Sequence, residues 1–581
     1  MVKDLVIDSS YHRLTLDDDS YKESCYHYSV AEVLVQTLYN LGVRIAMGLS
    51  GGAVAGLWDA FQQSLIKLLH YRHESGAAFA ATEYYFACGR PAAVISTTGP
   101  GITNAITGLF AARWEGAKLI FLSASTANSQ RGRWSFQETG TNTMGDDFFS
   151  AGPLFHYAAR IESPNDLPVV AMNLMQGLAR PSGFIAHISV PTTVQTSPSN
   201  NSLPVCYQRP LSLEPNEESI TKCKQLLSEG PFAIWLGFGA RSAASSIRHL
   251  AERTGAAVMC SPRGKGIFPE EHQQFVGVTG FGGHDSVLAY MKEFRPLRTL
   301  VLGSRLGEFT SFWNPDMVPE KGFIHIDIDP TVPCSAYPSA PTFAIQSDVE
   351  EFVIKLIKLL PERRVPNHSL ELPKPDINEV ELKDNGPVCP DVLMDAIQRI
   401  IVDNSDAIVM TEAGNAFAWG TNALRFSAPN RYRVSTGFGS MGHAVTGVLG
   451  AALARNSKAV AIVGDGAMLM NNEINTAVHY RLPVVWIVLN DSCYGMIEHG
   501  MRCQGYNNLD VHIPHTDFVQ FARSMGANGI KVTRETELDQ ALRMAMAATG
   551  PFVVDVEMDA SIPPPFGRRV SSLIAQGLTG K

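Results

Sequence analysis

Several features are absent from this sequence, and each absence narrows the class of protein. No apolar run reaches the ~18 residues that a membrane-spanning helix needs. The first 25 residues, MVKDLVIDSSYHRLTLDDDSYKESC, are polar and acidic, so we expect neither a signal peptide nor a membrane anchor. No long basic run accompanies the net charge of −9, which argues against nucleic acid or an anionic membrane as a partner.

Cysteine is also sparse and dispersed. The nine cysteines form no C-x-x-C pair, so the sequence lacks the pattern of a disulfide framework or of a zinc site. Scattered thiols are typical of a reducing compartment, and we expect a cytoplasmic protein. The 45% apolar and 18% charged residues are ordinary for a soluble globular protein, and 581 residues predict three or four domains at ~150 residues each.

Short apolar runs alternate with helical stretches, which is βαβ order and predicts parallel sheets covered on both faces. We expect an α/β fold of three doubly wound parallel-sheet domains. A Pro/Ser/Asn-rich segment near 189–204 is interpreted as a linker, and a charged, proline-containing segment near 360–387 as a second separator. The expected division is an N-terminal extension 1–24, domains 25–190, 205–360 and 388–560, and a C-terminal tail 561–581.

Polar residues follow two consecutive apolar runs in AIVGDGAMLMNNEINTAVHYRLPVVWIVLNDSCYGM, residues 461–496. Asp465 follows the first run, and Asn490 and Asp491 end the second. Ligands of parallel sheets bind beyond the carboxyl ends of the strands, where helix N-termini favour anions. Oxygen ligands from two adjacent strand ends would hold magnesium against a diphosphate. The alternative is that the GDG stretch is only a turn and the Asn-Asp pair only a cap.

These residues resemble the thiamine-diphosphate (ThDP) binding motif, GDG followed by NN, of the acetohydroxyacid synthase and pyruvate oxidase group. The resemblance extends along nearly the whole chain. HESGAAFAATEYYFACGRPAAVISTTGPGITNAITGL and RWSFQETG resemble the pyrimidine-binding domain, GKGIFPEEH and HIDIDP the middle domain, and GFGSMGHAVTGVLGAALA the start of the diphosphate-binding domain. It implies that 25–190, 205–360 and 388–560 are these three domains.

The resemblance implies roles for residues that would hold the cofactor. Glu74, expected at the end of a strand, matches the glutamate that hydrogen-bonds the aminopyrimidine and lets the cofactor act as its own base. Met441 matches the apolar wedge that bends the cofactor. The Gly439 carbonyl would accept a hydrogen bond from the amine of the aminopyrimidine. The remaining implied diphosphate contacts are Gly414, Asn415, Ala416, Gly464, Gly466 and Ala467. Ala416 replaces a histidine of true acetohydroxyacid synthases.

The magnesium ligands implied by the motif are carboxylate oxygens of Asp465 and Asp491 and the backbone carbonyl of Cys493. Two departures keep the second ligand open. The second Asn of the motif is Asp491, and the interval after GDG is about one residue short, so Asn490 remains a candidate.

On the substrate side, Phe136 and Gln137 match residues that line the thiazolium face. Gly500 aligns with a tryptophan that helps acetohydroxyacid synthases select a small acceptor, so a larger acceptor is expected here. The adjacent His499 is either a general acid or a polar wall residue, and a structural histidine is the alternative. If FAD were bound in the middle domain, its contacts would be Gly237, Gly239, Arg305 and Asp327; whether it binds stays open, because flavin-free relatives share such glycines.

Three functions remain compatible with the sequence. The first is a ThDP- and Mg²⁺-dependent carboligase that decarboxylates a 2-oxo acid and adds the resulting enamine to a second carbonyl compound, as in acyloin or acetolactate synthases. The second is a ThDP-dependent decarboxylase or FAD-linked oxidoreductase, and the third a non-catalytic binding subunit, which the intact motif residues disfavour. The resemblance also implies a homodimer or tetramer, in which Glu74 of one chain faces Asp465 of the other.

Overall fold

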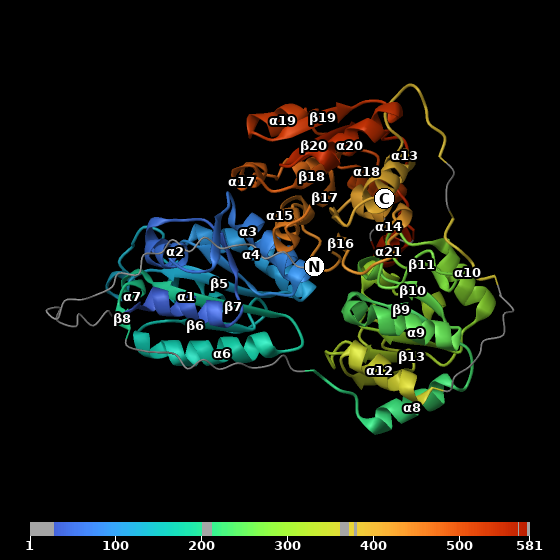
Figure 1. Ribbon diagram of the computed structural model, residues 1–581, viewed down its shortest axis with the longest axis horizontal. Coiled ribbons are helices and arrows are strands. Elements are labelled where there is room, and N and C mark those ends of the chain that lie inside the picture. Colours follow the sequence, from blue (N-terminus) through green and yellow to red (C-terminus); the bar gives the residue numbers. More distant parts are fainter. Residues whose placement is uncertain (1–27, 200–211, 361–370, 377–379, 568, 578–581) are drawn as a thin grey trace, which may run out of the picture.

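A computed structural model describes residues 28–199, 212–360, 371–376, 380–567 and 569–577. The expected extension 1–24 lies outside the described residues. The fold consists of three parallel six-stranded sheets, each with helices on its faces, which confirms the predicted α/β class. The sheets form three units that meet around the middle of the molecule (Figure 1). Below, each sheet with its helices is called the first, middle or third unit in chain order.

The first unit has the strand order β3-β2-β4-β5-β7-β6. The strands are β2 (Ile45–Gly48), β3 (Lys67–His70), β4 (Ala92–Ser96), β5 (Lys118–Ser125), β6 (Tyr157–Arg160) and β7 (Phe184–Pro191). The principal helices are α1 (Val30–Asn40), α2 (Ala55–Gln62), α3 (Glu74–Cys88), α4 (Pro100–Glu115) and α6 (Leu167–Ala179). A capping box of Ser29 and Glu32 begins α1. Two hydrophobic cores lie against the sheet, as expected for strands buried on both faces.

Two expectations for this unit are wrong. Glu74 does not end a strand, because β3 stops at His70 and Glu74 is the first residue of α3. The segment near 189–204 is not a plain linker in its described part. β7 continues to Pro191, α7 (Thr192–Gln195) follows, and β8 (Pro198–Ser199) pairs antiparallel with β1 (Tyr28–Ser29). The first unit therefore continues to Ser199, since this pairing returns the chain to the unit's beginning.

The middle unit has the order β11-β10-β9-β12-β13-β14. Its strands are β9 (Phe232–Leu236), β10 (Ala257–Cys260), β11 (Phe275–Val278), β12 (Arg298–Leu302), β13 (Phe323–Asp327) and β14 (Thr342–Gln346). Helices α8 (Glu217–Leu227), α9 (Ala244–Thr254), α10 (Asp285–Phe294) and α12 (Val349–Leu359) flank this sheet.

The third unit has the order β16-β15-β17-β18-β20-β19. Its strands are β15 (Ile408–Thr411), β16 (Tyr432–Val434), β17 (Ala459–Gly464), β18 (Val484–Asn490), β19 (Asn528–Val532) and β20 (Phe552–Glu557). Its principal helices are α13 (Pro390–Ile397), α14 (Asn415–Ala423), α15 (His443–Arg455), α18 (Gly495–Cys503), α19 (Phe518–Ser524) and α20 (Leu538–Ala547), with short α16 (Asp465–Met468) and α17 (Ile474–His479) after β17. Because β17 and β18 are parallel neighbours, their polar ends lie side by side as the sequence predicted.

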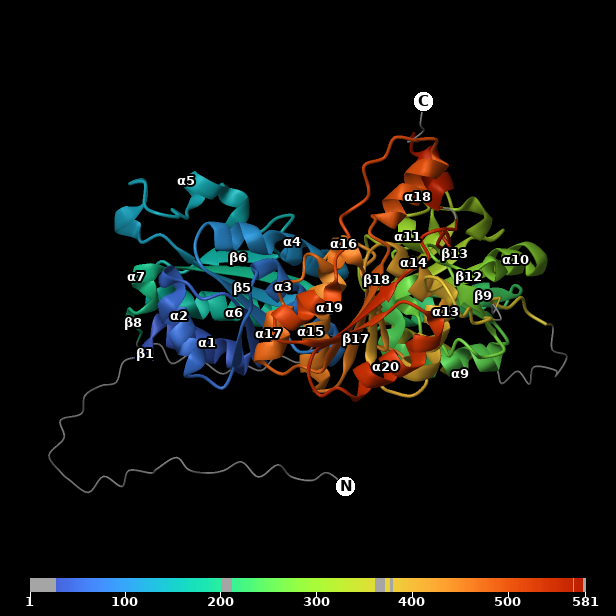
Figure 2. The ribbon, with the colours of Figure 1, turned by 90° about the horizontal axis from the view of Figure 1, so that it is seen from above.

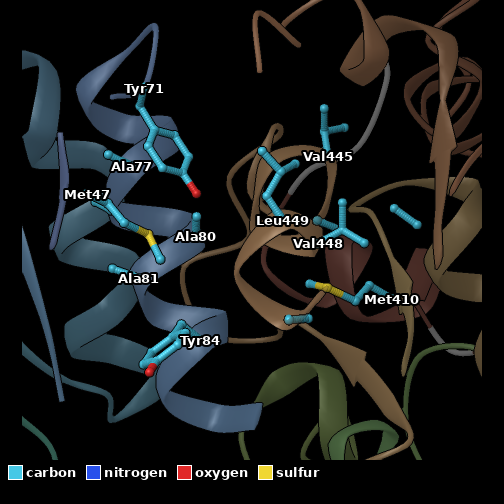
Figure 3. Packing of buried hydrophobic residues seen from close by; sticks show 14 of the residues in the cluster. Met47, Tyr71, Ala77, Ala80, Ala81, Tyr84, Met410, Val445, Val448 and Leu449 are labelled. Atoms are coloured by element: carbon cyan, nitrogen blue, oxygen red, sulfur yellow. The ribbon is translucent and has the colours of Figure 1, made fainter. Parts of the chain in front are cut away.

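Helix α3 of the first unit packs along α15 of the third, the most extensive helix–helix contact of the described chain. Ala80 of α3 faces Val448 and Leu449 of α15, whereas Ala77 and Ala81 lie on the other side of α3, next to Met47 (Figure 3). Small residues let the two backbones approach closely, so the relative position of these two units is determined by packing at short range.

Buried ion pairs join the units beside this seam. Glu83 of α3 accepts two hydrogen bonds of 2.8 Å from Arg433 of β16 and one of 2.9 Å from His443. Glu115 at the end of α4 pairs with Arg263 of the middle unit at 2.8 Å. Such pairs require good geometry to offset the cost of burying charge, so they favour one arrangement of the three units.

Helix α21 (Arg569–Ala575) lies within the expected C-terminal tail, and Arg569 forms an ion pair of 2.6 Å with Glu308 of the middle unit. In the described part of the chain, no helix combines the length and the apolar composition needed to cross a membrane.

Candidate functional site

A cavity of about 310 Å³ lies beyond the carboxyl ends of β15, β17 and β18 in the third unit. This is the edge at which a parallel sheet binds its ligands. His499 lines it, together with most of the residues expected to hold the cofactor and the metal: Gly414, Asn415, Ala416, Gly439, Met441, Gly464, Asp465, Gly466, Ala467, Asp491 and Cys493. The fold brings them together from four separate stretches of the chain, 414–416, 439–441, 464–467 and 491–499.

The two candidates for the second metal ligand lie in different surroundings. Asn490 is the last residue of β18, and its amide donates to Asp555 Oδ1 at 2.8 Å and to the Thr516 carbonyl at 3.0 Å. Asp491 lines the cavity, where its Oδ1 accepts from the Cys493 N–H at 3.2 Å. The Asn490 amide is thus bonded outside the cavity that Asp491 lines.

Ionising the two carboxyl groups of this cavity is unfavourable in the absence of a cation. Asp465 is buried, its Oδ1 accepts from the Gly466 N–H at 2.6 Å, and its Oδ2 has no hydrogen-bond partner. Burial raises the pKa of Asp465. Burial, with the nearby Asp465 charge, raises the pKa of Asp491 to about 7. Two desolvated like charges raise the cost of ionising either carboxyl group.

These groups fit a hard divalent cation. The partnerless Asp465 Oδ2, the Asp491 carboxylate and the nearby Cys493 carbonyl are the oxygen types that Mg²⁺ takes from proteins, usually beside water and phosphate oxygens. Among the described residues, no three His, Cys, Asp or Glu side chains form a metal cage on their own. A cation here would therefore need further ligands, such as diphosphate oxygens.

The start of α14, next to Asp491 in the cavity, fits a diphosphate. Helix α14 begins at Asn415, and its N-cap, Gly414, has φ +111° and provides no side chain to satisfy the first N–H groups. The Asn415 Oδ1 is buried without a partner, while an added Cβ at Gly495 would lie 2.7 Å from Asn415 Nδ2 and 3.0 Å from Asp491 Oδ2. Free N–H groups at a helix start bind anions, so the start of α14 complements the metal end.

Several glycines keep the cavity open. An added Cβ at Gly414, Gly439 or Gly464 would meet no atom within 4 Å. Gly466 instead allows close packing, because a Cβ there would lie 2.5 Å from the Tyr494 ring. The partly buried Met441 lines the cavity and packs against the core between the first and third units.

Glu74 and Gln137 lie outside this cavity and near each other in the first unit. Asn104 of α4 donates to Glu74 Oε2 at 3.2 Å, and an added Cβ at Gly101 would lie 3.2 Å from Glu74 Oε1. Thr98 donates to Gln137 Oε1 at 3.2 Å. Both side chains thus flank the start of α4. Glu74 is buried, with 5% of its surface exposed.

The loop that carries Gln137 presents aromatic side chains to solvent. Phe136 is 91% exposed and Trp134 is 96% exposed. In Figure 2 the segment around α5 (Thr141–Met144), which follows this loop, stands out from the body of the first unit. Large aromatic side chains with this exposure indicate a contact surface.

The substrate side contains residues that the sequence did not suggest. Phe309 of the middle unit and Ile562 of the C-terminal segment line the cavity, and Phe566 packs against His499 with ring centroids 6.0 Å apart. No motif marked these residues, because they reach the cavity only through tertiary packing. Gly500 is half-buried on α18 and does not line the cavity, and a Cβ there would meet no atom within 4 Å.

A second, larger cleft of about 990 Å³ lies where the three units meet. Three of the four residues expected to contact FAD line it, namely Gly239, Arg305 and Asp327. Gly237 does not, because a Cβ there would lie 2.2 Å from the Gly303 carbonyl oxygen, so this glycine permits close packing of two turns. Burial raises the pKa of Asp327 to about 6. The cleft is large enough for a dinucleotide, but these groups do not specify a flavin.

Three family models match the chain in order. The models are described as thiamine pyrophosphate enzyme N-terminal TPP binding domain, over residues 28–145, central domain, over 223–356, and C-terminal TPP binding domain, over 412–556. Thiamine pyrophosphate is another name for ThDP. Together the three matches span most of the described chain.

Curated relatives are similar over nearly their full length. The putative thiamine pyrophosphate-containing protein YdaP of Bacillus subtilis is 26% identical, with 93% of each chain covered. Acetolactate synthase isozyme 1 large subunit of Escherichia coli is 27% identical, covering 92% of this chain and 94% of the relative. The acetolactate synthase large subunit of Haemophilus influenzae is 28% identical, covering 92% and 95%.

A solved structure shares the fold. It is the X-ray structure of a putative thiamin diphosphate-dependent enzyme from Mycobacterium smegmatis, with a TM-score of 0.78 at 19% identity, covering 91% of this chain and 99% of that one. With three domain models matched in the family's order, the protein belongs to the thiamine pyrophosphate (ThDP) enzymes.

Proposed function

We propose that the protein is a ThDP- and Mg²⁺-dependent carboligase that decarboxylates a 2-oxo acid and joins the remaining acyl group to a second carbonyl compound. The observation that carries this proposal is the cavity at the strand ends of the third unit, which combines a partnerless buried Asp465 oxygen with the free N–H groups at the start of α14. The acetolactate synthase relatives support carboligation over the other reactions of the family.

In this proposal, Asp465, Asp491 and the Cys493 carbonyl hold Mg²⁺, and Gly414 with Asn415 binds the diphosphate. The orientation of the Asn490 amide toward Asp555 supports Asp491 as the second ligand. When bound, the cofactor supplies the electron sink that stabilises negative charge on the acyl carbon after CO₂ leaves. Met441 would orient the two rings of the cofactor, and the Glu74 carboxyl group would hydrogen-bond the aminopyrimidine and exchange a proton with it.

The proposal requires at least a homodimer. Among the described residues, those lining the cavity come from the middle and third units and none from the first, which carries Glu74 and Gln137. Docking of a second chain would bring its Glu74 to this cavity and cover the exposed Phe136 and Trp134. Light scattering of the active protein tests this, and a monomer with full activity would rule it out.

We further propose an acceptor larger than pyruvate. Gly500 does not line the cavity but follows the cavity residue His499, and an added Cβ at Gly500 would meet no atom within 4 Å. If the acceptor extends from the cavity past His499, Gly500→Trp should depress coupling of aromatic or long-chain acceptors more than it depresses donor decarboxylation, because the added indole would occupy space that only the acceptor uses. If the parent couples only pyruvate to itself, or both steps fall in parallel at unchanged stability, acetolactate synthesis proper replaces this proposal.

An FAD-linked oxidase or a simple decarboxylase is the second candidate. The observation that favours the flavin enzyme is the large cleft, which shares Gly439 and Phe309 with the smaller cavity. A visible flavin spectrum of the purified protein, with oxidant-dependent turnover, would support it. An unbound cleft with oxidant-independent product formation would exclude it.

The decisive experiment is product analysis with a panel of 2-oxo acids and aldehydes, run beside a Glu74→Gln variant. The parent should form coupled products. The variant should retain ThDP and Mg²⁺, whose anchors lie in the third unit, and should lose most turnover because a neutral amide cannot exchange the proton. Turnover of Glu74→Gln at the parental rate would contradict the role of Glu74.

A further inference from the structure

The turn before Glu74 is bound by a segment of the third unit. This turn, residues 70–73, connects β3 to α3 and immediately precedes Glu74. The His70 N–H donates to the Tyr480 hydroxyl at 2.7 Å, and Arg72 Nε donates to Asn475 Oδ1 at 2.7 Å. The binding segment, residues 473–480, begins a few residues after the GDG motif. The segment after the GDG motif of the third unit therefore contacts the turn before Glu74 of the first unit within one chain.

Glu473 makes the central contact of this seam. Its carboxylate accepts from the Arg72 N–H at 3.1 and 3.2 Å and from the His73 N–H at 2.9 Å. Only 1% of Glu473 is exposed. A carboxylate suits this position, because the N–H groups just before a helix have no partner within the helix and favour a negative charge.

We propose that Glu473 is a positioning residue that sets the place of Glu74 by holding the backbone of Arg72 and His73. Glu473 is itself held, because Thr476 donates to its carboxylate and the Asn471 side chain accepts from its N–H at 3.0 Å. Gly76 lets α3 approach the carboxylate, since a Cβ there would lie 2.8 Å from Glu473 Oε1. This inference rests on the proposed role of Glu74.

This role of Glu473 would not be detected by measuring cofactor affinity alone. Glu473 does not line the cavity, so its loss should leave the magnesium and diphosphate contacts in place. It should instead loosen the turn and move the Glu74 carboxyl group. A misplacement of ~1 Å costs about 100-fold in a reacting geometry.

The test uses full-length protein with ThDP and Mg²⁺ and five variants. Glu473→Ala removes the acceptor, Glu473→Gln keeps one oxygen for the two N–H groups, and Gly76→Ala displaces the carboxylate without removing it. Asn475→Ala is the matched control, because it deletes another contact of the same seam that does not touch the backbone of Arg72 or His73. Glu74→Gln reports the effect of losing Glu74 itself.

Three readouts apply to each variant. Hydrogen–deuterium exchange of the 71–75 amides measures the backbone contact, deuterium exchange at the thiazolium C2 of added ThDP measures proton removal, and a ThDP titration measures affinity. Glu473→Ala and Gly76→Ala should expose the amides and slow C2 exchange about 10- to 100-fold, with ThDP affinity within about twofold. Glu473→Gln should restore most of the rate, and Asn475→Ala should resemble the parent.

Parental C2 exchange in Glu473→Ala or Gly76→Ala with exposed amides would overturn the positioning role, as would a slow rate in Asn475→Ala. Amides that stay protected in Glu473→Ala would overturn the contact itself. Should Glu473→Ala not fold, Gly76→Ala and Glu473→Gln decide by the same criteria. Parental C2 exchange in Glu74→Gln would refute the proposed function, which separates that failure from a failure of this inference.

Discussion

Replacing Gly450 by alanine should destabilise the seam between the first and third units. Gly450 lies on α15 against α3, and an added Cβ would be 1.8 Å from the Ala80 carbonyl oxygen and 2.6 Å from its carbon. Both atoms belong to the backbone, so no rotation of a side chain relieves the overlap. The two helices must separate (Figure 3 shows the facing side chains).

The magnitude follows from the required separation. Non-bonded carbon and oxygen atoms need roughly 3.5 Å, so the helices must move apart by about 1.7 Å along this contact. A gap of ~0.5–1 Å already forfeits a quarter to a half of each dispersion contact. Inserting one methyl group in a packed core costs ~1–3 kcal/mol, and we expect at least the upper value because the obstacle is backbone. The higher helix propensity of alanine than of glycine offsets only ~1 kcal/mol of this cost.

The assay is urea unfolding of the cofactor-free protein, followed by tryptophan fluorescence and by circular dichroism. Gly450→Ala should lower the midpoint, whereas Gly500→Ala, a helical glycine whose added Cβ meets no atom within 4 Å, should leave it unchanged or raise it slightly. The two variants share the propensity gain and differ in the overlap. A Gly450→Ala protein as stable as the parent would refute the close approach of α3 and α15.

Three further predictions concern the metal, pH and the buried ion pair. Asp491→Ala should abolish Mg²⁺-dependent ThDP binding in a fluorescence titration, while Asn490→Ala should retain it, and the reverse order would show the ligands to be misassigned. Burial lowers the pKa of His187 to about 4. As the pH falls, His187 is therefore protonated in the unfolded chain before it is protonated in the folded protein. Its neutral ring then contributes stability that is present above pH ~6.5 and lost as the pH falls toward 4, up to about 3 kcal/mol, and His187→Gln should flatten this acid limb in urea melts. Although burial acts against it, the Arg433 guanidinium holds the pKa of Glu83 well below its usual range. Glu83→Gln should therefore cost ~3–5 kcal/mol in urea unfolding by leaving the Arg433 charge unpaired, and parental stability would contradict the importance of the pair.

The sequence predicted those parts of the candidate site that are marked by residues close together in the chain. Apolar runs ending in Asp465 and in Asn490-Asp491 marked two parallel strand ends, and the pairing of β17 with β18 confirmed that they are neighbours. Strand ends are visible in sequence because buried parallel strands are continuously apolar and end at glycine or polar residues. The same signal misplaced Glu74, since three further residues separate β3 from α3.

The sequence by itself determined the α/β class, the order of the three units and the stretches that form the cavity, because each depends on periodicity and turn residues a few positions apart. Only the tertiary structure decided which side chains meet. The fold bonds the Asn490 amide to Asp555 and leaves Asp491 in the cavity. The contact between Glu473 and His73 joins residues 400 positions apart, and such pairing depends on how complete units pack against each other.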